Sequence, residues 1–205
     1  MNKKVFETTL KYIKAFANLY GVIPIKEAQA MLNKYENKSY SIIEIIKDPS
    51  MITTDRYGFL IVENESDNLI VADDALYVSE DSLDELIQAQ QGKNYAKLQK
   101  EELLKYEDRD YFQRTPQFRN MITFLISALE ISQSKATEIA ENIAYMCIAG
   151  MSPDQVFELL EEDDIVFADM QQYNQFLMKF SDMANNTRIW ENCGHTPNEL
   201  RRNIK

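Results

Sequence analysis

The sequence predicts a mostly α-helical protein with a small β-hairpin, an α+β fold in which an acidic helical bundle follows a smaller N-terminal unit. Three observations support this class. Apolar residues recur three or four positions apart along most of the chain, which is the period of an amphipathic helix. Two short β-prone runs, Phe59–Val62 and Leu69–Ala72, interrupt that period. The charge is uneven, because residues 1–73 sum to −1 and residues 74–205 sum to −10.

Three helices are expected before the hairpin. The first should end at Gly21, where a left-handed cap is needed. Pro24 suits the first turn of the second helix, and Ser41 with Glu44 forms a capping box that opens the third. The apolar and amphipathic positions that define these helices are Val5, Thr9, Tyr12, Ile13, Phe16, Leu19, Tyr20, Ala28, Met31, Leu32, Tyr35, Ile42, Ile43, Ile45 and Ile46.

The polar stretch ENESDN separates the two β-prone runs and is expected to join them as a hairpin. Three helices followed by a hairpin resemble the order of elements in a winged helix-turn-helix, and residues 1–77 are assigned to such a unit. In that family the third helix enters the major groove of DNA. The resemblance makes four residues in or beside SIIEIIKD the candidate contact residues, namely Lys38, Tyr40, Glu44 and Lys47.

The charge of this unit argues against a nucleic-acid partner. The expected wing, residues 63–68, carries three acids and no cation. Lysines of the first helix, at positions 3, 4, 11 and 14, are the opposing signal. Because phosphate neutralisation supplies most of the non-specific affinity for DNA, an acidic wing weakens duplex binding. A protein is therefore the expected partner, and nucleic acid is the disfavoured alternative.

From residue 111 onward the chain is expected to form a helical unit that extends to residue 205, after a connecting helical and polar segment at residues 78–110. Serine or threonine, in two cases followed by proline, marks helix starts, and Gly150 marks a helix end. The last long helix is expected from about residue 166 to residue 184. The expected starts are Thr115-Pro116, Ser134 and Ser152-Pro153-Asp154-Gln155.

The most distinctive segment lies near the C-terminus, at residues 185–200. Thr196 and Glu199 fit a capping box with Pro197 in the first turn, and Gly194 suits a positive φ. Trp190, the only tryptophan, is expected to pack this tail onto the C-terminal helical unit. The distinctive residues of the tail are Arg188, Trp190, Gly194, His195, Thr196, Pro197 and Glu199.

This segment resembles an "NNTR-x-W-x-N-x-GHTPNEL"-like sequence in uncharacterised proteins of low-GC Gram-positive bacteria. In several of those proteins it precedes a SecA-type C-terminal zinc motif. The present chain stops at Lys205, before any CxCGSG-like cluster, so the metal function of those relatives is not carried over. The resemblance implies a bacterial source and a cytoplasmic location, and no activity.

The residues that catalysis or metal binding would need are scarce. Cys193 and His195 lie close in sequence, but Cys147 is the only other cysteine and no paired ligand spacing accompanies them. No phosphate-binding glycine motif or nucleophile motif is present. The acidic run at residues 161–164 lacks the spaced ligands of a calcium loop. No catalytic, cofactor-binding or metal-binding residue is therefore assigned, and no cofactor is expected.

Composition limits the function further. The chain has 205 residues, a formal charge of −11 and no apolar run of the roughly 20 residues that span a membrane. It shows no secretory signal, and two cysteines are too few for a disulfide framework. We expect a cytoplasmic, non-enzymatic protein that acts through protein–protein contacts. The first alternative is a DNA-binding transcriptional regulator with a C-terminal dimerisation unit, and the second is an enzyme with an unrecognised carboxylate site. A homo-oligomer is compatible with each reading.

Overall fold

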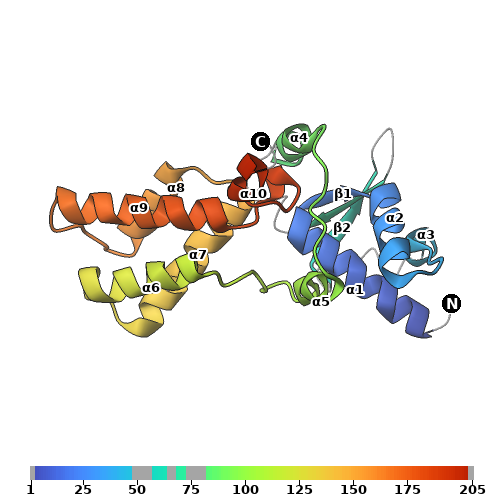
Figure 1. Cartoon of the computed structure of the whole chain (residues 1–205), viewed down its shortest axis with the longest axis horizontal. Helices are drawn as coiled ribbons and strands as arrows, with labels where there is room; N and C mark the ends of the chain where they lie inside the picture. Colours follow the sequence, from blue (N-terminus) through green and yellow to red (C-terminus); the bar gives the residue numbers. More distant parts are fainter. Residues whose placement is uncertain (1–2, 48–56, 64–67, 73–81, 203–205) are drawn as a thin grey trace. The chain divides into compact units, whose positions relative to one another are not determined.

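The computed structural model describes residues 3–47, 57–63, 68–72 and 82–202, and the chain divides into two compact units (Figure 1). The first unit combines Met1–Phe112 with Trp190–Gly194, and the second combines Gln113–Ile189 with His195–Lys205. The described residues are mostly helical, with one small antiparallel sheet, so the predicted fold class is confirmed. Each unit is described by itself.

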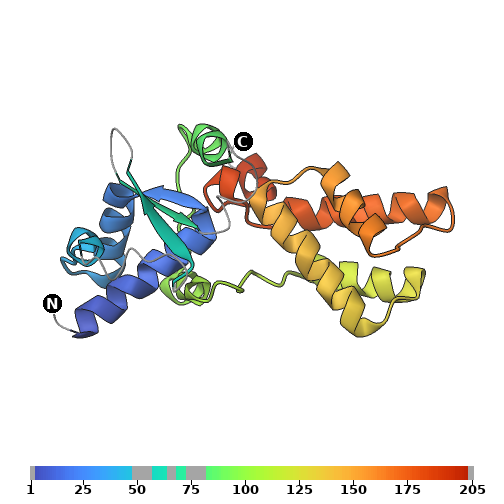
Figure 2. The same cartoon turned by 180° about the vertical axis from the view of Figure 1, so that it is seen from behind.

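The first unit begins with three helices and a three-stranded sheet, and the predicted bounds of the hairpin strands are confirmed. The sheet order is β1-β3-β2, with both pairs antiparallel. Figure 2 shows α1 running across the sheet, and α1 contributes the fully buried Phe16 and Tyr20 to the core of the first unit. The elements are α1 (Lys3–Tyr20), β1 (Val22–Pro24), α2 (Ile25–Glu36), α3 (Ile42–Ile46), β2 (Phe59–Val62) and β3 (Leu69–Ala72).

Strand β1 is the element that the sequence analysis missed. It has three residues between the end of α1 and the start of α2, and Val22 pairs with Val71 while Pro24 pairs with Leu69. Gly21 ends α1 with a φ of 70°, as expected, and its carbonyl accepts a hydrogen bond from the Ala72 N–H at 2.7 Å. Three residues are too few to show the alternation of apolar and polar residues by which a strand is recognised in sequence. Only the pairing with the fully buried β3 identifies β1 as a strand.

The segment predicted as a separate connection at residues 78–110 belongs, where the structure describes it, to the first unit. Its backbone carbonyls accept hydrogen bonds from side chains of α1 and α2. Tyr35 Oη donates to the Leu98 carbonyl at 2.7 Å, and Asn18 Nδ2 donates to the Tyr106 carbonyl at 3.3 Å. The polar residues at 88–97 resemble a linker in sequence, but Tyr20 Oη donates to the Ala96 carbonyl at 2.6 Å, so their main chain takes part in the packing of the first unit. The remaining elements of the first unit are α4 (Ser82–Gln90), α5 (Lys100–Leu103), a 3-10 turn (Leu104–Glu107) and, from the tail, a second 3-10 turn (Trp190–Asn192).

The second unit is a bundle of helices. In both views α6 and α9 lie side by side and α7 crosses them (Figures 1 and 2). Apolar side chains at helical spacing fill the core, with Phe124 of α6, Ile139 and Ile143 of α7 and Phe176 of α9 all buried. The helices are α6 (Pro116–Leu129), α7 (Gln133–Ala149), α8 (Pro153–Glu162), α9 (Met170–Asn186) and α10 (Pro197–Arg202).

The helix starts in this unit agree with the sequence except at two places. The Thr115 and Ser152 caps are confirmed, and Ser152 forms a full capping box with Gln155. The predicted cap at Ser134 is wrong, because Ser132 Oγ accepts the Lys135 N–H and α7 starts at Gln133. The last long helix starts four residues later than expected, at Met170, with Asp169 as its cap.

Phe167 explains why the start of α9 was misplaced. It has the spacing of a helical core residue, but it lies in the loop before the helix. From that loop its ring reaches Phe176 at a centroid distance of 5.3 Å. The neighbouring Val166 is 82% exposed and contributes nothing to the core. A loop side chain that folds back onto a helix cannot be distinguished from a helical one by periodicity alone.

Candidate functional site

The connection between α2 and α3 is held by two amide side chains of α2. Gln29 Oε1 accepts the Ile42 N–H at 2.7 Å, and Gln29 Nε2 donates to the Tyr40 carbonyl. Asn33 Oδ1 accepts the Tyr40 N–H at 2.7 Å. These bonds satisfy the backbone groups of a turn that has no regular structure of its own, so they fix where α3 lies on α2.

Helix α3 presents a mixed surface to solvent. Ile42 and Ile45 are buried, whereas Ile43 is 49% exposed, so the apolar run IIEII is divided between core and surface. Glu44 and Lys47 are also exposed. Ser41 Oγ accepts the Glu44 N–H at 3.3 Å and caps the helix, but the reciprocal bond of the predicted capping box, from the Ser41 N–H to the Glu44 side chain, is not formed.

The four candidate contact residues lie in or next to this helix. Lys38, Glu44 and Lys47 are exposed, while Tyr40 is half-buried in the turn. We call Lys38, Ile43, Glu44 and Lys47 the α3 surface. The sequence analysis did not single out Ile43, because its apolar side chain fits the same pattern as its buried neighbours. Residues 64–67 of the expected acidic wing lie outside the described residues.

Trp190 is buried, with 6% of its surface exposed, but it packs within the first unit and not against the final helices as predicted. Its Nε1–H donates to the Asn18 carbonyl at 2.9 Å. A Cβ on Gly21 would lie 2.6 Å from Trp190 Cγ, so glycine makes the space that the indole occupies. The sequence shows that such a residue is apolar. It does not show that the indole hydrogen-bonds to the Asn18 carbonyl and fills the space beside Gly21 at the end of α1.

Gln90 links three segments of the first unit, and the sequence analysis missed it. It is 6% exposed, and its Nε2 donates to the Tyr20 carbonyl at 2.7 Å and to the Trp190 carbonyl at 2.8 Å. Its Oε1 accepts from Tyr95 Oη at 3.2 Å. A buried amide with all these bonds made favours one arrangement of α1, α4 and the Trp190 turn.

The rest of the tail forms a polar cluster in the second unit. Arg188 and Glu199 form a bidentate ion pair with both N–O distances at 2.8 Å. Glu199 Oε2 also accepts the Thr196 N–H at 3.1 Å, and Thr196 Oγ1 accepts the Glu199 N–H, which is the predicted capping box with Pro197 in the first turn of α10. Burial opposes ionisation of Glu199, but the bonds from Arg188 and Thr196 outweigh it and hold its pKa below the usual value. His195 Nδ1 lies 3.5 Å from Glu199.

The two cysteines are buried free thiols in different units. Burial raises the pKa of Cys147 to about 12 and that of Cys193 to about 11. Cys193 follows the Trp190 turn with a φ of 51°, next to Gly194 at 76°. Within the part of the chain that the structure describes, no group of three His, Cys, Asp or Glu side chains is placed to hold a metal ion.

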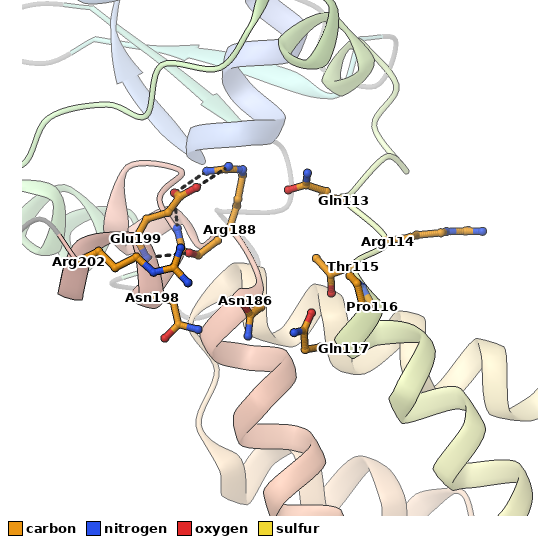
Figure 3. A pocket seen from close by; sticks show the side chains of 11 residues that line it. Gln113, Arg114, Thr115, Pro116, Gln117, Asn186, Arg188, Asn198, Glu199 and Arg202 are labelled. Atoms are coloured by element: carbon orange, nitrogen blue, oxygen red, sulfur yellow. Dashed lines mark hydrogen bonds and ion pairs between the residues drawn. The ribbon is translucent and has the colours of Figure 1, made fainter.

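A cavity of about 390 Å³ lies within the second unit, where α6 starts and α9 ends (Figure 3). Arg188 and Glu199 lie on one side of it, and Gln113 and Gln117 lie on the other, while Arg114 extends away. The lining residues are Gln113, Arg114, Thr115, Pro116, Gln117, Asn186, Arg188, Thr196, Asn198, Glu199 and Arg202.

Along the described residues, no helix combines the length and the apolar character that crossing a membrane requires. Searches against protein-family models, curated proteins and solved structures found no match to this chain.

Proposed function

We propose that this protein is a non-enzymatic binding protein whose first unit contacts another protein through the α3 surface. The observation that carries the proposal is Ile43. It is the large apolar side chain that the described part of the first unit leaves substantially exposed, at 49%, on a helix whose position is fixed by Gln29 and Asn33. A single exposed apolar residue is common on protein surfaces, so the proposal rests on Ile43 together with its fixed helix and the charged residues of the α3 surface.

The charge of the α3 surface supports a protein partner. Lys38 and Lys47 flank Glu44 in the sequence and all three are exposed, so the α3 surface carries charges of both signs. Such a surface can pair with side chains of both signs on a partner. A DNA backbone offers one sign only, and each acid facing it costs affinity.

A DNA-binding regulator is the second candidate, because the element order helix, strand, helix, helix and hairpin is that of a winged helix-turn-helix. The length of α3 weighs against it. Its five residues span about 7.5 Å, about one and a half turns, so few of its side chains could reach base edges in the major groove. The third candidate, an enzyme with a carboxylate site, has no such observation in its favour.

The experiment is site-specific photo-crosslinking in lysate of the source cells. A photoreactive residue at position 43 is compared with one at position 126, since Ile126 of α6 in the second unit is exposed to a similar degree, at 38%. We expect a discrete protein adduct from position 43 alone, and expect Glu44→Lys to reduce its yield. Equal adducts from the two positions, or none from either, would contradict the proposal.

A titration with random-sequence DNA duplex at about 150 mM salt distinguishes the DNA-binding regulator from the protein-binding proposal. We expect no complex at micromolar protein. A sub-micromolar complex with a steep salt dependence that Lys47→Ala weakens would replace the protein-binding proposal with the regulator. A crosslinked homodimer from position 43 would identify the partner as a second copy of this chain.

A further inference from the structure

We infer that the cavity between the start of α6 and α10 is a binding site for a small oxyanion-bearing molecule, a phosphate ester or a polycarboxylate. This inference is separate from the α3 surface, because every lining residue belongs to the second unit. It is carried by the charge of the cavity, by its amide side chains and by its size.

The cavity is positive within an acidic unit. The second unit has twelve Asp and Glu against eight Lys and Arg, yet the cavity is lined by three arginines and one glutamate. Glu199 neutralises Arg188 through the bidentate pair and also holds its guanidinium in place. Arg114 is paired with Glu141 at 2.5 Å and extends away from the cavity. Arg202 forms no ion pair with any residue in the described part of the chain, so its charge is the one available to a ligand.

The start of α6 adds to this potential. Thr115 caps the helix, Pro116 follows, and no acid stands in the first turn of its 14 residues. The partial positive charge of a helix N-terminus is commonly balanced by Asp or Glu in that turn, and here no side chain of the turn does so. The N-terminus therefore acts together with Arg202, and neither is the sole basis of the site.

The polar lining sets the chemistry of the ligand. Gln113, Gln117, Asn186 and Asn198 contribute amides, and Pro116 is the only apolar residue among those that line the cavity. The side-chain amides of Gln113 and Gln117 make no hydrogen bond to any described residue, so they are available as donors and acceptors. No aromatic ring is present to stack on a base, so a nucleobase has no platform in this cavity.

The size of the cavity favours a small molecule over a polymer. A volume of about 390 Å³ equals that of about a dozen water molecules and falls in the range of small-molecule sites, about 300–1,000 Å³. An acidic peptide or a nucleic acid would have to continue from the cavity onto the acidic surface of the unit. A small anion keeps its charge inside the positive region.

The test is isothermal titration of the full chain with pyrophosphate, glucose 6-phosphate and citrate, each at matched ionic strength with chloride as the control anion. The matched variants are Arg202→Ala and Arg201→Ala, which remove the same charge from adjacent positions of α10, only one of which lines the cavity. We expect at least one probe to bind. We also expect Arg202→Ala to raise its Kd about tenfold or more, because a hydrogen-bonded charge contact is lost, and Arg201→Ala to leave the Kd within about twofold.

The three probes identify the source of the oxyanion, because binding of the phosphates alone indicates a phosphate ester and binding of citrate alone a polycarboxylate. Gln117→Leu tests the amide side of the cavity without touching a charge, and it should also weaken binding. Absence of binding by all probes at 5 mM (about the weak end of useful affinity) would overturn the inference. So would equal losses in the two arginine variants, since these would indicate attraction by net charge alone.

Discussion

Each of the two units of this chain is stabilised by a different kind of internal contact. In the first unit, side chains bond to backbone groups far away in sequence. Trp190 donates to Asn18 across 172 positions, Gln90 to Trp190 across 100, and Tyr20 to Ala96 across 76. In the second unit, helices carry apolar faces and begin at local caps, each bonded three residues ahead. These caps are Thr115, Ser132, Ser152 and Asp169.

Because of this difference, the substitutions that destabilise the first unit most should be of another kind than those that destabilise the second. A local cap stabilises its own helix, and its loss shortens or frays one element. A long-range bond to a carbonyl fixes two or three segments at once, so its loss disturbs their packing together. We therefore expect single polar substitutions to cost the first unit more than the second, and the following experiments test that expectation from the largest effect to the smallest.

The largest effect is expected for Trp190→Ala. The substitution removes a buried indole that fills the space over Gly21, and emptying a core of a large aromatic side chain costs about 3–5 kcal/mol. The midpoint of denaturant unfolding, followed by circular dichroism, should fall sharply. Trp190→Phe keeps most of the packing and loses the bond to Asn18, so it should lose less.

Thiol labelling shows which unit the Trp190 substitution opens, because each unit contains one buried cysteine. At pH 8 both native thiols should react slowly, since burial raises their pKa values to about 12 and about 11. Trp190→Ala should accelerate labelling of Cys193 and leave Cys147 near its original rate. Equal acceleration of both thiols would mean that the units unfold together, which would end the comparison.

Gln90→Leu should have the next largest effect. Leucine fills a similar volume but leaves the Tyr20 and Trp190 carbonyls without the donor that satisfies them. A buried acceptor left unsatisfied costs about 1–3 kcal/mol. The neighbouring Gln91 is exposed, and Gln91→Leu should change the free energy of unfolding by less than about 0.5 kcal/mol. Similar losses in the two variants would show that the buried network adds little.

The same difference explains how far the sequence predicted the fold. Periodicity and caps depend on residues within one or two turns, so the hairpin strands, the first three helices and the starts at Thr115 and Ser152 were predicted correctly. The docking of Trp190 and the role of Gln90 depend on carbonyls about 70 to 170 positions away. Main-chain carbonyls have no residue type, so no sequence pattern marks them.

The candidate sites show the same limit. Of the candidate contact residues, Lys38, Glu44 and Lys47 are exposed and Tyr40 is half-buried, but Ile43 matched its buried neighbours in every sequence property. The cavity was not predicted, although Arg188, Thr196 and Glu199 of the tail were singled out. Its other wall comes from Gln113 and Gln117, and their proximity depends on the packing of α6 against α9.

A cap in the second unit should give a smaller loss, confined to one helix. Ser132→Ala removes the acceptor for the Lys135 N–H and should cost about 1 kcal/mol. Ser134, two residues later, lies inside α7 and is exposed, so Ser134→Ala should be neutral or slightly stabilising, because alanine favours helices. The thermal midpoints of the two variants provide the measurement. The opposite order would restore Ser134 as the cap and move the start of α7.

The smallest effect is expected for the loss of stability at low pH, and one ion-paired carboxylate in each unit, Glu36 or Glu199, tests it. Burial opposes ionisation of Glu36, but Lys100 at 2.7 Å and Tyr12 Oη at 2.7 Å outweigh it and lower its pKa, as Arg188 and Thr196 do for Glu199. A lowered folded-state pKa gives stability that is present above the unfolded pKa, about 4.3 for Glu, and is lost as the pH falls through the folded value.

Wild-type stability should therefore be nearly constant from pH 7 to about pH 5.5 with respect to these two groups and should decline below that range. Glu36→Gln and Glu199→Gln should each lower the thermal midpoint at pH 7 slightly and make its decline between about pH 5 and pH 3 shallower. Glu36 is the more buried of the two, with 16% of its side chain exposed against 38% for Glu199, and solvent screens an exposed pair more strongly. The change should consequently be larger for Glu36 in the first unit. A larger change for Glu199 would show that the ion pair beside the cavity contributes more stability than its exposure suggests.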